Sequence, residues 1–398
     1  MPASDTQRYY LPLLDRHVAL WPGARVLELG YYDPAAAIWA AQRGAGVVAL
    51  RPTLDQVREV EATARAAGAS GLDVRLAVQP EPSERGTFDV ALVLAPYFLG
   101  NAAVREAFAT VAAALRPEGV LFVQVHRRRG GETYVRMAAE LFATVELLGM
   151  GGGQRRLYRA IGPRASVLAA PAAGTQRPTL EFVVGGLTLH LRTAAGVFGA
   201  HRVDPASRLL VETVRLGRRA RVLDLGCGSG AIGLALAALH PDAQVTLVDI
   251  SRPAVEVAGE NARLNRLKNV TVLLSDGYSA LAGQRFDAIV SNLPAHRGHR
   301  ADLETAERLI AGAPEHLRAG GAAWFVAGKA LPYEHTASRA FRQVQIAAAD
   351  GRYKVLHCTE PRARAAMAGG RARGRGERPA AQEASGTLLR RVGGVPMS

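Results

Sequence analysis

The hydrophobic positions of this chain form short apolar runs, separated by longer alanine-rich stretches that mix polar and apolar residues. In the first half, the runs lie near residues 25–29, 46–50, 72–77, 88–94 and 119–125. In the second half, they lie near residues 221–225, 244–249, 270–274, 286–291 and 321–327. Short runs rich in β-branched residues are typical of strands buried on both faces, and the stretches between them have helical length. The pattern predicts an α/β fold with mostly parallel sheets and helices on both faces.

The chain also repeats itself, at offsets of 196 to 202 residues. Residues 24–30 resemble residues 220–226, residues 88–96 resemble residues 286–294, and residues 115–121 resemble residues 317–323. One accidental match is easy, but three in the same order are not. We therefore predict two copies of one domain, at residues 1–160 and 178–360, joined by a linker at residues 161–177 that is rich in Pro, Gly and Ala.

Two segments stand apart from this repeat. Residues 180–193 alternate polar and apolar positions around a Gly-Gly pair, which predicts a β-hairpin that opens the second copy. Residues 361–398 hold eight Arg and two Glu among many Ala and Gly, without an aromatic residue. Such a tail cannot bury enough surface to fold, so we predict that it is disordered. It could bind phosphates or remain a solvated tail.

Composition narrows the class of protein. The net charge is +14, which favours polyanionic partners such as nucleic acid or acidic membranes, although an arginine-rich proteome would give the same value. The two cysteines, Cys227 and Cys358, exclude a disulfide framework and have no metal-ligand spacing. The chain has no signal-peptide pattern and no run of 18 apolar residues, so we expect a cytoplasmic, monomeric protein without metal or membrane contact.

A glycine-rich turn in the second copy predicts a cofactor site. It follows a strand, precedes a predicted helix at 231–239, and has glycines that let a ligand approach the backbone, at Gly226, Gly228 and Gly230. The turn alone also fits a dinucleotide. However, Asp224 would repel a pyrophosphate and could face the ammonium of a methionine moiety. Asp249, at the end of the next strand, could hold both ribose hydroxyls.

Asp276 and Cys227 each have two interpretations. Asp276 follows the third strand, where it could accept a hydrogen bond from an adenine amino group or could instead be a helix N-cap or turn residue. Cys227 is better explained as a small residue in a tight turn than as a nucleophile. The two residues therefore add less to the prediction than the glycines do.

The segment 291–296, Ser-Asn-Leu-Pro-Ala-His, predicts the reacting site. An exocyclic amine is a poor nucleophile because its lone pair is delocalised into the ring. The side-chain oxygen of Asn292 and the carbonyl of Leu293, before Pro294, can each accept one amine N–H and so aim the lone pair. The alternative for this segment is a simple strand-ending turn.

The first copy lacks these features. Its turn reads Gly-Tyr-Tyr-Asp-Pro at residues 30–34, and Pro34 has no N–H to offer. Arg51 stands near the position of Asp249, and Leu94 stands at the position of Asn292. We therefore predict that the first copy keeps the fold but neither binds the cofactor nor reacts, and that it serves as an RNA-binding platform or as a packing partner.

The second half resembles the tandem-domain ribosomal RNA guanine-N2 methyltransferases, the RsmC/RlmG-like family. Beyond the glycine turn, the resemblance rests on residues 196–198 followed by Asp204, and on residues 291–296, 320–321, 326–327, 331–334 and 351–355. It implies two Rossmann-like class I domains with seven-stranded sheets, of which the first is degenerate. It also implies S-adenosylmethionine as cofactor, and ribosomal RNA or a ribosomal subunit as the partner whose guanine N2 is methylated.

One departure from the family concerns the base-binding residues. The family motif is Asn-Pro-Pro-Phe, whereas here Ala295 replaces the aromatic residue. Phe198 or His296 is the expected substitute as a stacking partner. Arg297 and Arg300 could hold phosphates at the mouth of the site, or could belong to a solvated loop.

Two other functions remain open from the residues, and a third is disfavoured. A protein glutamine or adenine amino methyltransferase also uses an Asn-Pro-type motif. A catalytically impaired RNA-binding or ribosome-assembly factor would fit Ala295 and the basic tail. An NAD enzyme is disfavoured by Asp224.

Overall fold

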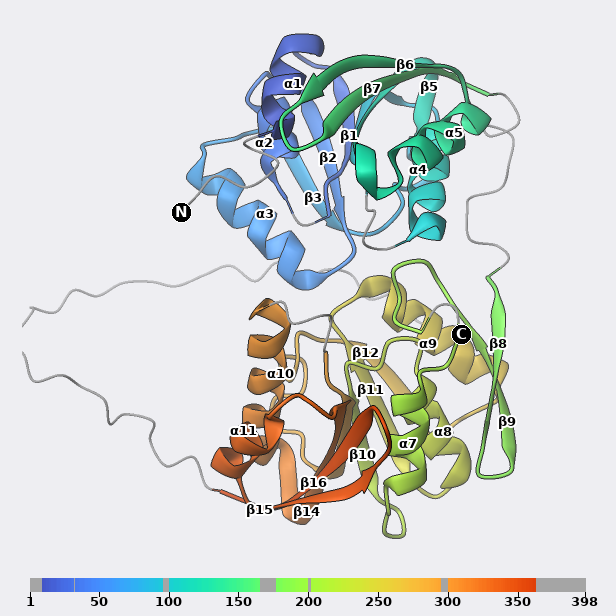
Figure 1. The fold of residues 1–398 in the computed structure, drawn as a ribbon, viewed down its shortest axis with the longest axis vertical. Coiled ribbons are helices and arrows are strands. Elements are labelled where there is room, and N and C mark those ends of the chain that lie inside the picture. Colours follow the sequence, from blue (N-terminus) through green and yellow to red (C-terminus); the bar gives the residue numbers. More distant parts are fainter. Residues whose placement is uncertain are drawn as a thin grey trace, which may run out of the picture. The chain divides into compact units, whose positions relative to one another are not determined.

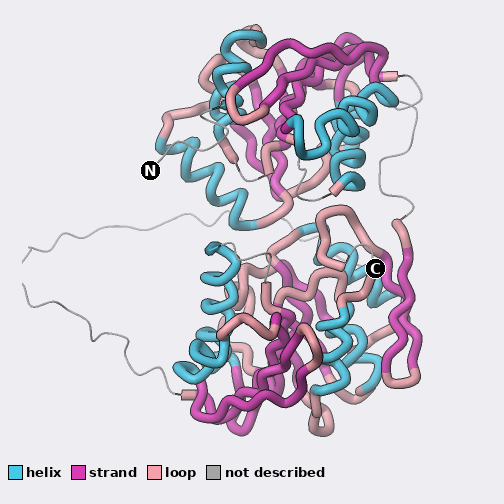
Figure 2. Tube along the Cα trace, in the orientation of Figure 1, coloured by secondary structure: helices cyan, strands magenta, loops and turns pink. Residues whose placement is uncertain are grey.

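The structure is a computed structural model that describes residues 9–31, 33–95, 100–164, 177–199, 202–294 and 300–362. Each half of the chain contains one seven-stranded sheet with helices beside it. In Figure 2 the strands of each half lie between helices, which is the layered arrangement that the apolar runs predict.

The first half follows the order expected of alternating strands and helices. Its strands are β1 (Arg25–Leu29), β2 (Gly46–Arg51), β3 (Leu72–Leu76), β4 (Phe88–Leu94), β5 (Leu115–His126), β6 (Phe142–Gly151) and β7 (Arg155–Pro163). Its helices are α1 (Leu11–His17), α2 (Ala35–Ala41), α3 (Leu54–Ala66), α4 (Asn101–Ala114) and α5 (Glu132–Leu141), with short turns η2 (Pro82–Glu84) and η4 (Arg127–Gly131). The spatial order of the strands is β3-β2-β1-β4-β5-β7-β6.

The second half repeats this order. Its sheet contains β10 (Arg221–Leu225), β11 (Gln244–Asp249), β12 (Val270–Leu274), β13 (Phe286–Asn292), β14 (Leu317–Gly328), β15 (Phe341–Ala349) and β16 (Tyr353–Pro361). Its helices are α7 (Pro205–Thr213), α8 (Ala231–Leu239), α9 (Arg252–Leu264), α10 (Arg300–Gly312) and α11 (Tyr333–Ala340), with the turn η5 (Ala313–His316). The strand order is β12-β11-β10-β13-β14-β16-β15, which matches the first half strand for strand and confirms the predicted duplication.

The strand order predicts a ligand-binding crevice at the carboxyl ends of the central strands of the second sheet. β10 pairs in parallel with β11 on one side and with β13 on the other, so the order of strands reverses at β10. In open α/β sheets, the connections on the two sides of such a reversal leave a crevice at the carboxyl ends of the strands. The residues that follow β10, β11 and β13 therefore meet at this end of the sheet.

The core of the second half lies on both faces of its sheet. Val222 packs on one face with α7, α8 and α9, and Leu223 packs on the other face with α10 and α11. This alternation along β10 is the period of two that a strand imposes. The first half has the same two-faced core, with α1 and α2 on one side and α4 and α5 on the other.

The predicted hairpin is present as β8 (Thr179–Val184) and β9 (Leu187–Arg192), an antiparallel pair visible beside the second half in Figure 1. Gly185 and Gly186 both have positive φ, at 57° and 79°, which is the requirement of a two-residue turn between such strands. Asn261 of α9 donates to the carbonyl of Arg192 at 3.0 Å, which fixes the hairpin to the domain.

The structure corrects two boundaries and adds strands that the sequence pattern did not locate. Pro361 ends β16, so the second copy extends past residue 360 into the predicted tail at 361–398. Residues 161–163 continue β7, with Pro163 opposite Phe142, so the predicted linker at 161–177 starts too early. Residues 165–176 of that linker, and the predicted tail from residue 363 onward, lie outside the described residues. The antiparallel pairs β6–β7 and β15–β16 were not among the strands placed from the sequence.

Candidate active site

The second half contains a cavity of about 450 Å³ at the carboxyl ends of β10, β11 and β13. A cavity of this size is in the range that holds a cofactor. Its wall includes the glycine turn and most of the other residues singled out from the sequence, namely Phe198, Gly226, Gly228, Asp249, Asp276, Asn292, Leu293 and Pro294. The fold thus brings together residues that are up to about a hundred positions apart in the chain.

The glycine turn forms the floor of this cavity. Gly226, Gly228 and Gly230 have φ values of 75°, 55° and 88°, which other residues rarely adopt. The N–H of Gly226 donates to the carbonyl of Val248 at 2.9 Å, which holds the turn against β11. A Cβ added at Gly226 would meet no atom within 4 Å, so the space above the turn is open.

Asp249 stands at the end of β11 and lines the cavity. Its Oδ2 accepts from Gly228 N at 2.8 Å, and its Oδ1 accepts from Ser251 N at 2.9 Å. Burial raises the pKa of Asp249, and the two N–H donors act against that rise. These donors fix the carboxylate beside the turn, where its remaining lone pairs can accept from two hydroxyl groups of a ribose.

Asp224 lies beneath the turn, fully buried, and the cavity wall formed by the described residues does not include it. Its Oδ2 accepts from Gly233 N at 2.8 Å, while Oδ1 has no hydrogen-bond partner among the described residues. Burial raises the pKa of Asp224 to about 7, with a further rise from the nearby charge of Asp249. The contact of Asp224 with an ammonium group stays a prediction, and the unpartnered oxygen is compatible with it.

Asp276 lines the cavity, but its carboxylate already pairs with two arginines. Arg308 of α10 donates to Oδ1 at 2.9 Å, and Arg58 of α3 donates to Oδ2. Burial acts to raise the pKa of Asp276, but these two arginines outweigh it and lower the pKa below its usual value. The residue lies in a turn and caps no helix, so the turn alternative describes its backbone, while a contact with adenine stays a prediction.

Asn292 is the last residue of β13, and its side-chain amide has a defined orientation. The amide nitrogen donates to Asp204 Oδ2 at 3.0 Å and to Ser207 Oγ at 3.3 Å. Asp204 is itself fixed because it is the N-cap of α7, where its Oδ1 accepts from Ala206 N at 3.1 Å. With the nitrogen used in this way, the side-chain oxygen is the atom left to accept from a substrate amine.

Asp204 and Ser207 were not among the predicted site residues. Asp204 appeared in the sequence only as part of the family resemblance, without a role. Its local signal is an Asp-Pro pair at the start of a helix, which identifies an N-cap. Its contact with Asn292, 88 residues away, depends on the packing of α7 against β13 and could not be read from either segment.

The segments around 331–334 and 351–355 pack near the turn that follows β13. The hydroxyl of Tyr333 donates to the carbonyl of Pro294 at 3.5 Å. Lys354, which is 5% exposed, donates to both oxygens of Glu334 at 2.6 and 2.8 Å. Leu293 is buried, and its N–H donates to the carbonyl of Val326 at 3.0 Å. The strand-end turn is therefore fixed at several points despite having one proline fewer than the family motif.

Of the predicted base-binding residues, the structure places only Phe198. This side chain is 48% exposed and lines the cavity, and its stacking on a base stays a prediction. His296 and Arg297 lie outside the described residues, as does Ala295. Arg300 begins α10, but its side chain is not described.

The corresponding place in the first half is filled by its own side chains. Arg51 and Glu28 are both fully buried and form an ion pair at 2.7 Å. Arg51 also donates to the carbonyl of Leu50 at 2.8 Å. Burial raises the pKa of Glu28, against the opposing effect of Arg51. A Cβ added at Gly30 would come within 1.9 Å of Glu28 Oε1 and 2.9 Å of the Arg51 guanidinium, so this turn is closed.

Three other features bear on the chemistry. Cys227 is buried, and burial raises the pKa of its thiol well above the usual value, which agrees with a structural residue. Within the described ranges, no group of three or more His, Cys, Asp or Glu side chains could hold a metal ion. No helix in the part of the chain that the structure describes is long and apolar enough to cross a membrane.

The sheet order, the open glycine turn, the carboxylate ending the next strand and the Asn-Leu-Pro segment ending the fourth define a class I S-adenosylmethionine-dependent methyltransferase. The family model described as methyltransferase small domain matches residues 188–357. A ribosomal RNA small subunit methyltransferase C of Salmonella paratyphi B is 35% identical over 244 residues, which cover 61% of this chain and 68% of that protein. The protein of the same name from Pectobacterium atrosepticum is 39% identical over 179 residues, covering 45% of this chain and 50% of that protein.

A solved structure extends the comparison to both halves. The 16S rRNA N2 guanine methyltransferase of T. thermophilus, in complex with AdoMet and guanosine, has a TM-score of 0.73 at 29% identity. The match covers 88% of this chain and 91% of that one. This chain belongs to the ribosomal RNA small subunit methyltransferase C family.

Proposed function

We propose that this protein transfers the methyl group of S-adenosylmethionine to the exocyclic N2 amine of a guanine in ribosomal RNA. The observation that carries the proposal is the fixed amide of Asn292. Asp204 and Ser207 accept from its nitrogen, so its oxygen is presented as an acceptor at the cavity wall. The relatives that are named for ribosomal RNA methylation, and the T. thermophilus structure with guanosine, support guanine as the substrate base.

The described residues fit the cofactor. The open space over Gly226 and the positive φ values of the turn allow close approach of a ligand to the backbone. Asp249 offers carboxylate oxygens to a ribose from its fixed place beside Gly228. When bound, S-adenosylmethionine supplies an electrophilic methyl group on a sulfonium. The predicted roles of Asp224, Gly230 and Asp276 in holding it remain part of this proposal.

The chain's own part in the transfer is positioning. Asn292 and the carbonyl of Leu293 accept the two N–H groups of the amine, so that its lone pair points into the cavity toward the methyl group. Holding the reacting atoms in this arrangement lowers the activation barrier, because the entropy cost of bringing them together is met when the substrates bind. Pro294 and Tyr333 keep the Leu293 carbonyl in place through the 3.5 Å contact between them.

Phe198 is our choice for the side chain that stacks on the guanine. It is the half-exposed aromatic residue of the cavity wall, and Ala295 has no ring to offer. An aromatic face binds an extruded base by stacking, which contributes roughly 1–3 kcal/mol per base. His296, Arg297 and Arg300 complete the proposed substrate site as predicted from the sequence.

We also propose that only the second half binds the cofactor, because Glu28 and Arg51 fill the corresponding place in the first. All side chains assigned to the reaction come from one half of one chain, so a monomer has a complete site. The cytoplasm, where ribosomal RNA is found, is the proposed location.

Methyl-labelled S-adenosylmethionine supplied with naked ribosomal RNA, isolated small and large subunits, or total protein tests the proposal. We expect label in RNA as N2-methylguanine, with loss of roughly a hundredfold or more in rate for Asn292→Ala because the amine is no longer oriented. Leu94→Ala, the same position in the first half, is the matched control and should keep the rate. Label in protein glutamine or in adenine would support the alternative amino methyltransferases, and cofactor binding without any transfer would support an impaired RNA-binding factor.

A further inference from the structure

The turn η4 in the first half corresponds to the segment after β14 in the second half. Gly328, which ends β14, lines the cofactor cavity, whereas η4 follows β5 and reads Arg-Arg-Arg-Gly-Gly. We propose that the surface formed by Arg127, Arg128, Arg129 and Arg155, here called the arginine patch, binds the phosphates of the RNA substrate. The inference rests on the proposed function, because it assigns part of the same RNA to the first half.

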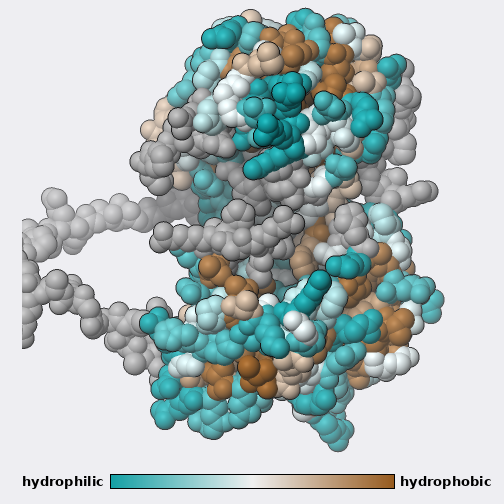
Figure 3. Space-filling view, viewed as in Figure 1, coloured by the Kyte–Doolittle hydropathy of each residue, from teal (hydrophilic) through white to brown (hydrophobic). Residues whose placement is uncertain are grey.

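Three of the four arginines of the patch are exposed, and two of them line a surface hollow. Arg127, Arg128 and Arg129 are all exposed, and Arg127 and Arg128 line a surface hollow of about 380 Å³. The rest of the wall of this hollow consists of Gly130, Gly131, Glu132 and Thr133. Figure 3 shows hydrophilic side chains gathered on the part of the first half that Figure 1 assigns to the segment before α5. A hollow walled by guanidinium groups and backbone suits a phosphate group.

Two strands hold the arginine patch in place. The N–H of Arg127 donates to the carbonyl of Gln154 at 2.9 Å, which joins η4 to the turn between β6 and β7. The N–H of Arg128 donates to His126 Nδ1 at 3.2 Å. His126 lies opposite Arg155 in the β5–β7 pairing, which brings the fourth arginine beside the first three. The patch is therefore built on ordered backbone at the carboxyl end of β5.

The local electrostatic field is positive. Burial lowers the pKa of His126, and repulsion from Arg155, Arg129 and Arg128 lowers it further. Three arginines thus act on one imidazole. A single acid, Glu132, lines the hollow beside them. An anion that enters this place gains from several guanidinium groups at once.

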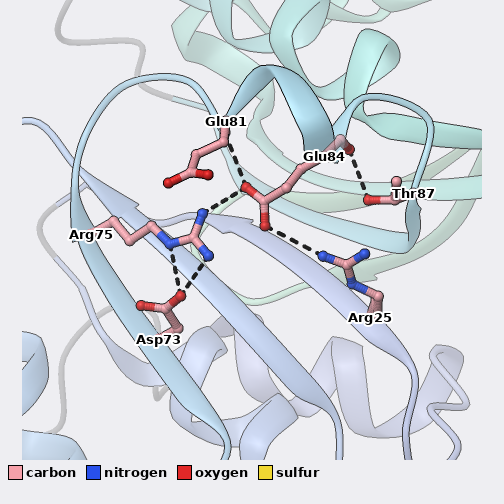
Figure 4. Close-up of polar contacts among 6 residues, drawn as sticks. All are labelled: Arg25, Asp73, Arg75, Glu81, Glu84 and Thr87. Atoms are coloured by element: carbon pink, nitrogen blue, oxygen red, sulfur yellow. Dashed lines mark hydrogen bonds and ion pairs between the residues drawn. The ribbon is translucent and has the colours of Figure 1, made fainter.

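Other arginines of the first half have a different role, as Figure 4 shows. Arg75 donates to Asp73 at 2.7 Å and to Glu84 at 2.6 Å, and Arg25 donates to Glu84 at 3.4 Å. Their charges are balanced within the fold and connect β1 and β3 to η2. Arg127 and Arg128, by contrast, are exposed and line the hollow.

RNA is the polyanion that the chemistry favours. Arginine forks bind phosphate oxygens in pairs, and contacts to phosphates orient a strand without reading its sequence. A methyltransferase that reads one base needs such contacts outside the base pocket to hold the strand in register. The arginine patch supplies them from the half that lacks the reacting residues.

The test is the binding of a fluorescent small-subunit ribosomal RNA transcript to full-length protein over a range of salt concentrations. We expect Arg127→Ala/Arg128→Ala to weaken binding about tenfold or more near 0.1 M salt, and to lower the slope of log affinity against log salt by about 1–2. Arg127→Lys/Arg128→Lys should keep most of the slope. Arg105→Ala is the matched control, because Arg105 is an exposed arginine of the same half already paired with Glu140. Affinity for S-adenosylmethionine should be unchanged in all variants.

Two outcomes separate this inference from the proposed function. If the double alanine variant binds RNA with the affinity and salt slope of the unmodified protein, the arginine patch is not an RNA site. Methylation of guanine would then still stand. If the unmodified protein binds RNA through the patch but never forms N2-methylguanine, the proposed function fails while the patch stands.

Discussion

The glycine turns of the two halves lie at corresponding places in two sheets of the same strand order, yet one is open and the other closed. Above Gly226, a Cβ would meet no atom within 4 Å. Above Gly30, it would come within 1.9 Å of Glu28 Oε1 and within 2.7 Å of the Asp33 carbonyl. The difference is made by two side chains. Glu28 stands where the second half has Asp224, and Arg51 stands where it has Asp249.

This comparison teaches how a sheet can keep its fold without its ligand. In the second half, Asp224 is fully buried with its Oδ1 unpartnered among the described residues, and the partly buried Asp249 lines the open cavity. In the first half, the Arg51 guanidinium supplies the positive charge from within the chain. Buried charges are costly unless they are paired. Arg51, which stands at the position of Asp249, both fills the cavity of the first half and pairs with the buried Glu28.

Among the variants that test this comparison, Arg51→Met should have the largest effect on the free energy of unfolding. It leaves Glu28 buried without its partner, so the free energy of unfolding should fall by about 3–5 kcal/mol. Denaturant unfolding measures this. The double variant Glu28→Leu/Arg51→Met removes both charges and should recover most of the loss. A single Arg51→Met variant as stable as the unmodified protein would show that the pair does not hold the closed turn.

Asp224→Asn tests the unpaired acid of the open turn through pH. The folded protein holds this proton up to a pKa of about 7, whereas the usual value is 3.8. The folded state therefore binds more protons than the unfolded chain between these values, and stability falls as pH rises through that window. The asparagine variant lacks this loss and should be more stable than the unmodified protein at pH 8, by about 2–4 kcal/mol, and similar near pH 4.

Thermal or denaturant unfolding at pH 4, 6 and 8 measures the effect, with Glu28→Gln as the matched variant in the closed turn. That change leaves Arg51 buried with a neutral partner, so it should lower stability instead. Equal responses of the two variants at pH 8 would contradict the proposed difference between a paired and an unpaired acid.

The smallest expected effect comes from adding one methyl group to each turn. Gly30→Ala should lower stability by about 1–3 kcal/mol, because its Cβ overlaps side-chain and backbone atoms. Gly226→Ala meets no neighbour but has a φ of 75°, so it should cost about 1 kcal/mol. Only Gly226→Ala should weaken cofactor binding in a calorimetric titration. Weaker cofactor binding in Gly30→Ala, with none in Gly226→Ala, would reverse the assignment of the two turns.

Much of this architecture follows from local sequence. Most of the parallel strands of each half are apolar runs, and the three glycines of the turn stand where the backbone has positive φ. The strand β6 was missed because it is the edge strand of the sheet, where Leu147 and Met150 are exposed and a bulge between Leu147 and Gly149 interrupts the alternation. Its neighbour β7 was missed because arginines interrupt its apolar positions. An edge strand with one solvated face has no continuous apolar signal.

The missed site contacts have a different cause. The orientation of the Asn292 amide depends on Asp204, and the charge of Asp276 depends on Arg308 and Arg58. Each partner is far away in the sequence and reaches its contact only because helices and strands pack together in the fold. The sequence pattern identifies which residue types stand at the carboxyl ends of strands, but not which oxygen of a carboxylate is already in use.

We propose that the chain has one cofactor site and that this site is in the second half. Calorimetric titration of the full-length protein with S-adenosylmethionine tests it most directly, using the unmodified chain, Asp249→Ala and Glu28→Leu/Arg51→Met. We predict one cofactor per chain, loss of affinity of about a hundredfold in Asp249→Ala because the ribose loses its carboxylate, and no change in Glu28→Leu/Arg51→Met. Two cofactors per chain in the unmodified protein, or a site that survives Asp249→Ala and disappears in the first-half variant, would contradict the account.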